Sequence, residues 1–210
     1  MPGMNRRGFG ALELISVLAI LAILTALVLP RVLRTTPPAQ IPQTVNEAHI
    51  TQALAELQAL EPAIAAHVAQ SGSLASRNGT PLAFSDSYDN FGQVLLSEGV
   101  IERPFWFNLG TNTTLRLVKL ASVSSGTQFD ALNGLYDLDG DGHNDMVGAA
   151  FVLEATIAGV HEVEASALND RLDGPRLGAR PGENDLVGRV VYLVAGPDGV
   201  TTVHIYITRR

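Results

Sequence analysis

The sequence predicts an α+β fold, in which an N-terminal transmembrane or assembly helix and a second helix precede an antiparallel β-sheet domain. Three observations predict this fold. A long apolar run opens the chain, a stretch with helical periodicity follows, and the C-terminal half contains segments that alternate apolar and polar residues between turn signals. A chain of 210 residues is long enough for one domain with an appendage.

The first element is the apolar run within "RRGFGALELISVLAILAILTALVLP", residues 6–30. No charged residue lies between Leu14 and Leu29, and a helix of this length spans about 30 Å, the thickness of a bilayer core. The Glu13 carboxylate is costly there unless it has a partner. A secretory signal peptide and an uncleaved anchor with its basic end inside remain alternatives. Neither alternative explains Glu13.

Residues 31–42 form a proline-rich break, because each proline lacks an N–H and disfavours a regular helix. The segment that follows carries apolar residues at roughly helical spacing, so we expect a helix from about 43 to the stop signal at Ser71–Gly72. Pro62 is a candidate kink in this helix. His49 and His67 are expected on its solvated surface. We expect residues 43–210 to form one α+β extracytoplasmic globular domain.

The remaining elements follow from turn signals and periodicity. We expect a loop over 71–89, a short helix over 89–99, strands over 114–120 and 146–159, a helix over 161–174, and a hairpin over 189–208 whose turn is "GPDG". His204 falls on the polar side of the last strand, so it is expected to face outward and to have no catalytic role. Trp106 is expected in the core or in a subunit contact.

The N-terminus resembles the type IV pilin and pseudopilin family. The resemblance rests on Arg6, Arg7, Gly8, Phe9 and Glu13, followed by the apolar run. In that family a basic leader is cut after the glycine, the new N-terminal phenylalanine is methylated, and a glutamate stands at the fifth mature position. Counted from Phe9, Glu13 is the fifth residue. The resemblance therefore implies a leader over 1–8, an assembly helix over 9–30, processing at Gly8 and Phe9, and assembly through Glu13.

Physical chemistry agrees with this implication. Cleavage after Gly8 would create an α-amino cation on Phe9 in apolar surroundings, and Glu13 of a neighbouring subunit would supply its counter-charge. Such a pair would fix the axial register of otherwise smooth apolar helices. The partners implied by the resemblance are a prepilin peptidase and methylase, other pilin or pseudopilin subunits, and the inner membrane. The implied location is the bacterial inner membrane before assembly and a periplasmic or cell-surface filament afterwards.

A second motif, "YDLDGDGHNDMV", predicts a calcium loop over 137–148. Asp137, Asp139, Asp141 and Asp145 occupy loop positions 1, 3, 5 and 9, and His143 at position 7 offers its backbone carbonyl. Position 12 is glycine instead of the bidentate glutamate of an EF-hand, so the loop is closer to the short calcium loops between β-strands of extracellular proteins. The alternative is an acidic, glycine-rich turn. Some pseudopilins hold their globular region with calcium.

Composition and missing motifs narrow the function. A net charge of -7 argues against nucleic-acid binding, and the absence of cysteine excludes a disulfide and thiolate chemistry. No metalloprotease, nucleophile-elbow, P-loop or dinucleotide motif is present, so we expect no enzyme. The sequence favours a structural subunit of a type IV pilus or type II secretion pseudopilus. The alternative is a membrane-anchored extracytoplasmic calcium-binding or adhesive module that does not polymerise.

Overall fold

The computed structural model describes residues 40–120, 130–178 and 182–210. Contacts divide the chain into two units, Met1–Val45 and Asn46–Arg210. The predicted leader over 1–8 and the predicted helix over 9–30 lie outside the described residues. No helix among the described residues is long and apolar enough to cross a membrane.

The helix α2 (Gln40–Ser71) opens the described part. It begins inside the predicted break over 31–42 and carries Pro42 in its first turn, where an N–H has no intrahelical partner and proline is tolerated. Pro62 lies within the helix without ending it. The helix ends as predicted: Gly72 has a φ of +78° and its N–H donates to the Val68 carbonyl at 2.9 Å.

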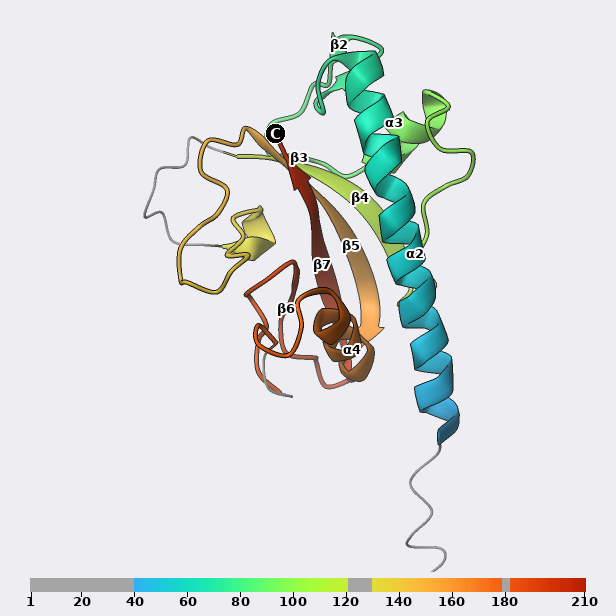
Figure 1. Ribbon diagram of the computed structural model, residues 1–210, viewed down its shortest axis with the longest axis vertical. Helices are drawn as coiled ribbons and strands as arrows, with labels where there is room; N and C mark the ends of the chain where they lie inside the picture. Colours follow the sequence, from blue (N-terminus) through green and yellow to red (C-terminus); the bar gives the residue numbers. More distant parts are fainter. Residues whose placement is uncertain (1–39, 121–129, 179–181) are drawn as a thin grey trace, which may run out of the picture. The chain divides into compact units, whose positions relative to one another are not determined.

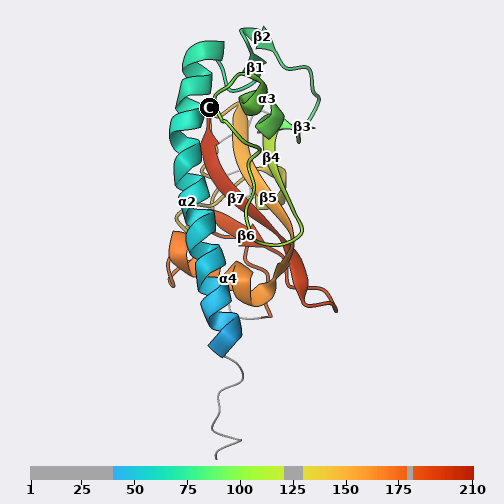
Figure 2. The same cartoon turned by 90° about the vertical axis from the view of Figure 1, so that its right-hand side faces the viewer.

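The sheet of the domain is antiparallel and confirms the predicted α+β class. Its order is β3-β4-β5-β7-β6, as Figures 1 and 2 show. The strands are β3 (Ser87–Tyr88), β4 (Asn112–Lys119), β5 (Phe151–His161), β6 (Val190–Tyr192) and β7 (Val200–Arg209). The other helices of the described residues are α3 (Phe91–Ser97), α4 (Glu162–Leu172) and the short 3-10 helix η1 (Ala131–Asn133).

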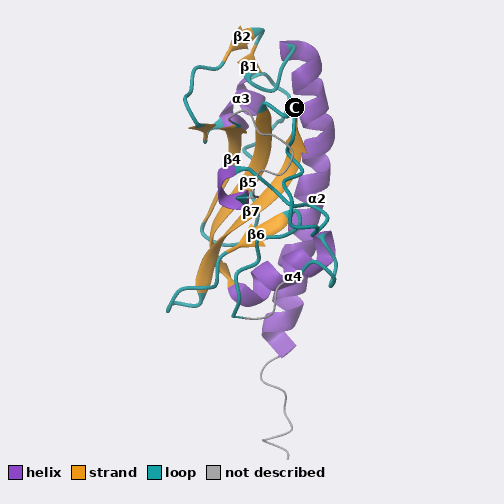
Figure 3. Ribbon diagram, turned by 90° about the vertical axis from the view of Figure 1, so that its left-hand side faces the viewer, coloured by secondary structure: helices purple, strands orange, loops and turns teal. Residues whose placement is uncertain are grey.

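The two faces of this sheet are covered differently. Leu117, Leu153 and Ile205 are fully buried on the face that packs against the helices, in one large core with residues of α2, α3 and α4. Figure 3 shows these helices beside the strands. The opposite face carries Val118, Val152 and Val191, which pack with Tyr136, Met146 and other residues of the segment after η1. The sheet is therefore buried on both faces, which positions the loop that carries the acidic motif.

Three expectations need correction. His67 is fully buried, not solvated, because the end of α3 packs over α2 and places Glu98 beside the imidazole. His204 is only 9% exposed, because the segment after η1 covers the face predicted to be open. Trp106 is 44% exposed, so its interpretation as a core residue is wrong. The alternative of a subunit contact for Trp106 stays a prediction.

The predicted loop over 71–89 contains a small hairpin. The strands β1 (Ser76–Arg77) and β2 (Thr80–Pro81) pair around Asn78 and Gly79. These two residues have φ values of +48° and +77°, as a tight turn between antiparallel strands requires. The dipeptide Asn-Gly is a strong sequence signal for a hairpin of this kind.

Candidate metal centre

The acidic loop lies between η1 and β5, on the side of the sheet away from α2. Asp137 is its buried anchor, with 1% of the residue exposed. One carboxylate oxygen of Asp137 accepts the N–H groups of Gly140 at 2.8 Å and Asp141 at 3.2 Å. The other oxygen accepts the N–H of Gly142 at 2.9 Å. The chain is thereby wrapped around a single carboxylate.

Three carboxylates converge within this wrapped loop. One oxygen from each of Asp137, Asp139 and Asp145 lies within 4.8 Å of the others. Calcium binds carboxylate oxygens at about 2.3–2.6 Å, so two ligands on opposite sides of one ion stand about 5 Å apart. The spacing of the three oxygens therefore fits a single ion of this size, and the all-oxygen donor set suits a hard cation.

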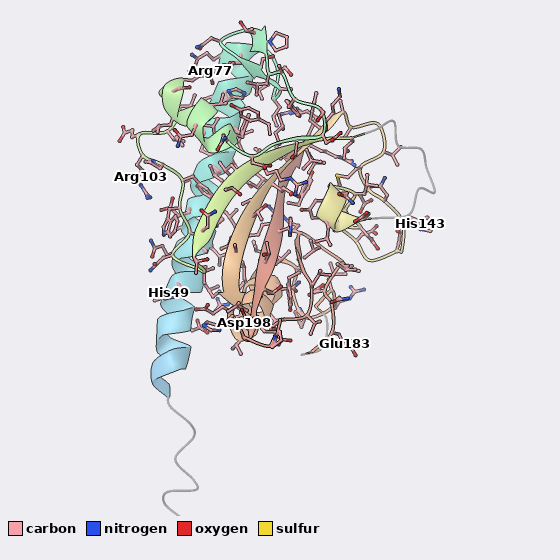
Figure 4. All side chains as sticks on the ribbon, turned by 180° about the vertical axis from the view of Figure 1, so that it is seen from behind. His49, Arg77, Arg103, His143, Glu183 and Asp198 are labelled. Carbon is pink, nitrogen blue, oxygen red and sulfur yellow. The ribbon has the colours of Figure 1, made fainter. Side chains whose placement is uncertain are left out.

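Asp141 and His143 are placed differently from these three residues. The Asp141 carboxylate accepts the His143 N–H at 2.8 Å, and its oxygen lies 3.2 Å from the His143 imidazole Nδ1. Both side chains are more than half exposed. Figure 4 shows His143 at the outer edge of the loop. The described geometry thus gathers three of the four predicted aspartates, and ligation by Asp141 and by the His143 carbonyl remains a prediction.

Asp145 closes the loop on itself. Its carboxylate accepts the N–H of Leu138 at 2.6 Å, and its own N–H donates to the carbonyl of Tyr136 at 2.8 Å. These two hydrogen bonds bring loop position 9 back to the beginning of the loop. The carboxylate of Asp145 therefore lies beside that of Asp137, although the two residues are eight positions apart in the loop.

Two contacts fasten the loop to the rest of the domain. The Gly188 N–H donates to the Asp137 carbonyl at 2.7 Å, which ties the loop to the segment before β6. Gly140 has a φ of +81°, and a Cβ at this position would stand only 2.8 Å from the Leu177 side chain. The loop therefore packs directly against residues that follow α4.

Beneath the loop lies a buried polar network that the sequence analysis missed. Glu154 of β5 is fully buried, and its carboxylate accepts the Tyr136 hydroxyl at 2.6 Å. Arg116 Nη1 and His204 Nδ1 lie 3.4 Å and 3.3 Å from its other oxygen. Burial and the Glu154 charge raise the pKa of Tyr136 well above its ordinary value, so its hydroxyl stays a donor. A lone carboxylate within the apolar stretch "FVLEATIAG" was the available signal.

The predicted processing and assembly residues Gly8, Phe9 and Glu13 lie outside the described residues. Comparisons of the chain with family models, curated proteins and solved structures found no match.

Proposed function

We propose that this protein is a structural subunit of a type IV pilus or type II secretion pseudopilus, made as a prepilin. Its leader is cut after Gly8, Phe9 becomes the methylated N-terminus, and the helix over 9–30 drives assembly from the inner membrane. The observation that carries this proposal is Glu13, a carboxylate five residues into an apolar run that begins after a basic pair and glycine. A helix followed by an antiparallel sheet is an architecture compatible with it.

The mature N-terminus provides the direct test of processing. We expect mass spectrometry of the protein from a bacterium with a prepilin peptidase to find a chain that begins at methylated Phe9. The reason is that the peptidase reads the Gly8–Phe9 junction and the basic residues before it. A chain that still begins at Met1 or Met4, or one that is cut near Pro30, would contradict the proposal.

Assembly is tested separately by the substitution Glu13→Val. Removing the carboxylate favours membrane insertion, since a charge within a membrane helix costs about 2.5–3.5 kcal/mol at the centre and less near the interface. The same change deletes the partner of the Phe9 amine. We therefore expect normal processing but little incorporation into filaments, measured by sedimentation of sheared material. Normal incorporation of the variant would favour a membrane-anchored module with no use for Glu13.

We further propose that the loop binds one Ca²⁺ through Asp137, Asp139 and Asp145, with Asp141 and the His143 carbonyl completing the coordination. The convergence of three carboxylate oxygens supports this part of the proposal. A chain without cysteine has no disulfide to hold its C-terminal half. The ion would serve structure, not catalysis.

A further inference from the structure

The last turn of α4 contains a buried side-chain amide whose oxygen lacks a hydrogen-bond partner. Asn169 is 1% exposed, and its Nδ2 donates to an Asp185 carboxylate oxygen at 2.6 Å and to the Val190 carbonyl at 3.0 Å. The Val190 carbonyl can only accept a hydrogen bond, so the amide nitrogen must lie on that side. The Asn169 Oδ1 therefore points the other way, where it is buried and accepts no hydrogen bond from the residues that the structure describes. A buried acceptor in this state costs free energy and calls for a partner.

A second oxygen faces the same point as this amide oxygen. It belongs to Asp170, the next residue along α4, whose side chain is exposed. A Cβ on Gly178 would stand 3.2 Å from Asn169 Oδ1 and 3.4 Å from Asp170 Oδ1. The amide oxygen thus borders this point from the buried side and the carboxylate from the solvent side. None of the ion pairs among the described residues involves Asp170.

Several negative charges surround this end of α4. Burial raises the pKa of the Tyr192 hydroxyl, and the Asp185 carboxylate raises that pKa further. The carboxylates of Glu162 and Asp170 act on the pKa in the same direction, whereas a hydrogen bond with Ser166 opposes them. Three carboxylates are therefore close enough to act on one hydroxyl. Their combined charge favours a cation nearby.

We propose that Asn169 Oδ1 and the Asp170 carboxylate bind a divalent cation beside Gly178, with Ca²⁺ as the ion to be tested. Amide and carboxylate oxygens are typical ligands of Ca²⁺, and water completes the coordination where a site is open to solvent. The ion would supply the partner that Asn169 Oδ1 lacks. This site shares no residue with the acidic loop over 137–148, so it depends neither on calcium in that loop nor on the filament function.

Calorimetric titration of the full-length protein in detergent with calcium tests the site. We expect the Asp139→Asn variant, which removes a ligand of the acidic loop, to retain one calcium-binding event. Adding Gly178→Ala should weaken that event by at least about tenfold, as the loss of even an outer-shell partner of a metal does. The new methyl group would occupy the point that both oxygens face. Gly178 does not have a left-handed φ, so alanine adds no backbone strain.

A second variant tests the ligand directly. Asp170→Asn keeps the shape of an exposed side chain and removes its charge, so it should weaken the same binding event without changing the melting temperature in chelator. The matched control is Glu183→Gln, which removes a charge from another exposed position of the C-terminal half and should leave the binding event unchanged. If Gly178→Ala lowers the melting temperature in chelator, Asp170→Asn decides the question alone.

The two proposed calcium sites fail separately in this experiment. Calcium binding that Asp139→Asn abolishes completely, or that persists unchanged in both Gly178→Ala and Asp170→Asn, would overturn the site at the end of α4. A buried water would then be the partner of Asn169 Oδ1. Conversely, binding that is insensitive to Asp139→Asn and lost in Asp170→Asn would support this site and overturn the one in the acidic loop.

Discussion

Glu98 shows how single residues fasten separate segments of this domain together. Its side chain is fully shielded and lies 2.5 Å from His67 Nδ1. It also accepts the Ser71 hydroxyl and the Asn78 N–H, both at 2.8 Å. One carboxylate at the end of α3 therefore joins the last turns of α2 to the β1–β2 turn.

The state of Glu98 predicts a pH dependence of stability. Burial by itself raises its pKa, but the hydrogen bonds from His67, Asn78 and Ser71 outweigh burial and hold the pKa below the ordinary value of 4.5. A carboxyl with a lowered pKa in the folded state stabilises the fold above its unfolded pKa, and this stability is lost as the pH falls through the folded pKa. We expect chemical denaturation to show a loss of stability below about pH 4.5 that depends on Glu98.

The matching variant is Glu98→Gln, which keeps the shape of the side chain and removes its charge. At pH 7 it should lose about 1.5–3 kcal/mol of unfolding free energy, the usual range for hydrogen bonds to charged groups. Its acid-induced loss of stability should be smaller than that of the unmutated protein. Identical pH profiles for the two proteins would show that Glu98 is not the group responsible. Glu102→Gln, at an exposed position nearby, is the control.

Buried polar residues were the part of the structure least accessible from the sequence. The period-two pattern placed His204 correctly on the polar face of β7, but it contained no information on what covers that face. His67 differs, because it continues the buried stripe of α2 at helical spacing after Leu60 and Ile64, so periodicity alone predicts its burial. The buried partner of Glu154, in contrast, could be predicted from the sequence. A carboxylate inside an apolar run is costly to bury unless it has a hydrogen-bond or charge partner, and this holds for Glu154 as it does for Glu13.

At the level of elements, the acidic loop is shaped by two glycines that have the same backbone conformation and different surroundings. Gly140 and Gly142 have φ values of +81° and +84°. A Cβ on Gly140 would approach Leu177 to 2.8 Å, whereas a Cβ on Gly142 would meet no atom within 4 Å. Comparing substitutions at Gly140 and Gly142 therefore distinguishes the cost of backbone strain from the cost of disturbing the packing against the segment after α4.

We expect Gly142→Ala to cost about 1–2 kcal/mol of unfolding free energy, the penalty of a left-handed conformation for an L-residue. Gly140→Ala carries the same strain and must also displace Leu177, so it should cost measurably more. Thermal or denaturant unfolding of the two variants checks the order. Restoring part of the Gly140→Ala loss with Leu177→Ala would identify the packing contact, and equal costs for the two glycine variants would contradict it.

Elements with a long periodic pattern were predicted well, and those defined by local turns were not. The hairpin of β6 and β7 and the helix α4 appear within a few residues of their expected bounds. The strand expected from 146 begins at Phe151, because Met146 and Ala149 form a turn, in which the Ala149 N–H donates to the Met146 carbonyl. Apolar composition alone could not distinguish that turn from the strand that follows it.

At the scale of the whole molecule, the unit Asn46–Arg210 contains no disulfide. Its acidic loop contacts several segments that are distant in the sequence. Asp137 contacts the residues before β6 through Gly188, and Tyr136 reaches β5 through Glu154. Without a cation, three carboxylates within 4.8 Å would repel one another at neutral pH. An ion at this point would therefore stabilise connections across the whole unit.

We therefore expect a fragment beginning at Gln40 to melt at a higher temperature in calcium than in chelator. At a 100-fold excess over the dissociation constant, an ion bound only by the folded state adds about 2.7 kcal/mol, a large share of the ~5–15 kcal/mol that stabilises a domain. Magnesium should substitute poorly, because it requires a tighter octahedral site.

Two matched substitutions refine the calcium test, because each removes one charge with little change in shape. Asp139 belongs to the convergent group of three and Asp141 turns towards His143. Asp139→Asn should therefore abolish most of the calcium-dependent rise in melting temperature, whereas Asp141→Asn should reduce it less. Calorimetry in calcium and in chelator measures both differences. Equal melting of the unmutated fragment in the two conditions would leave the loop as an acidic turn, stabilised by the N–H groups that surround Asp137 and by no ion.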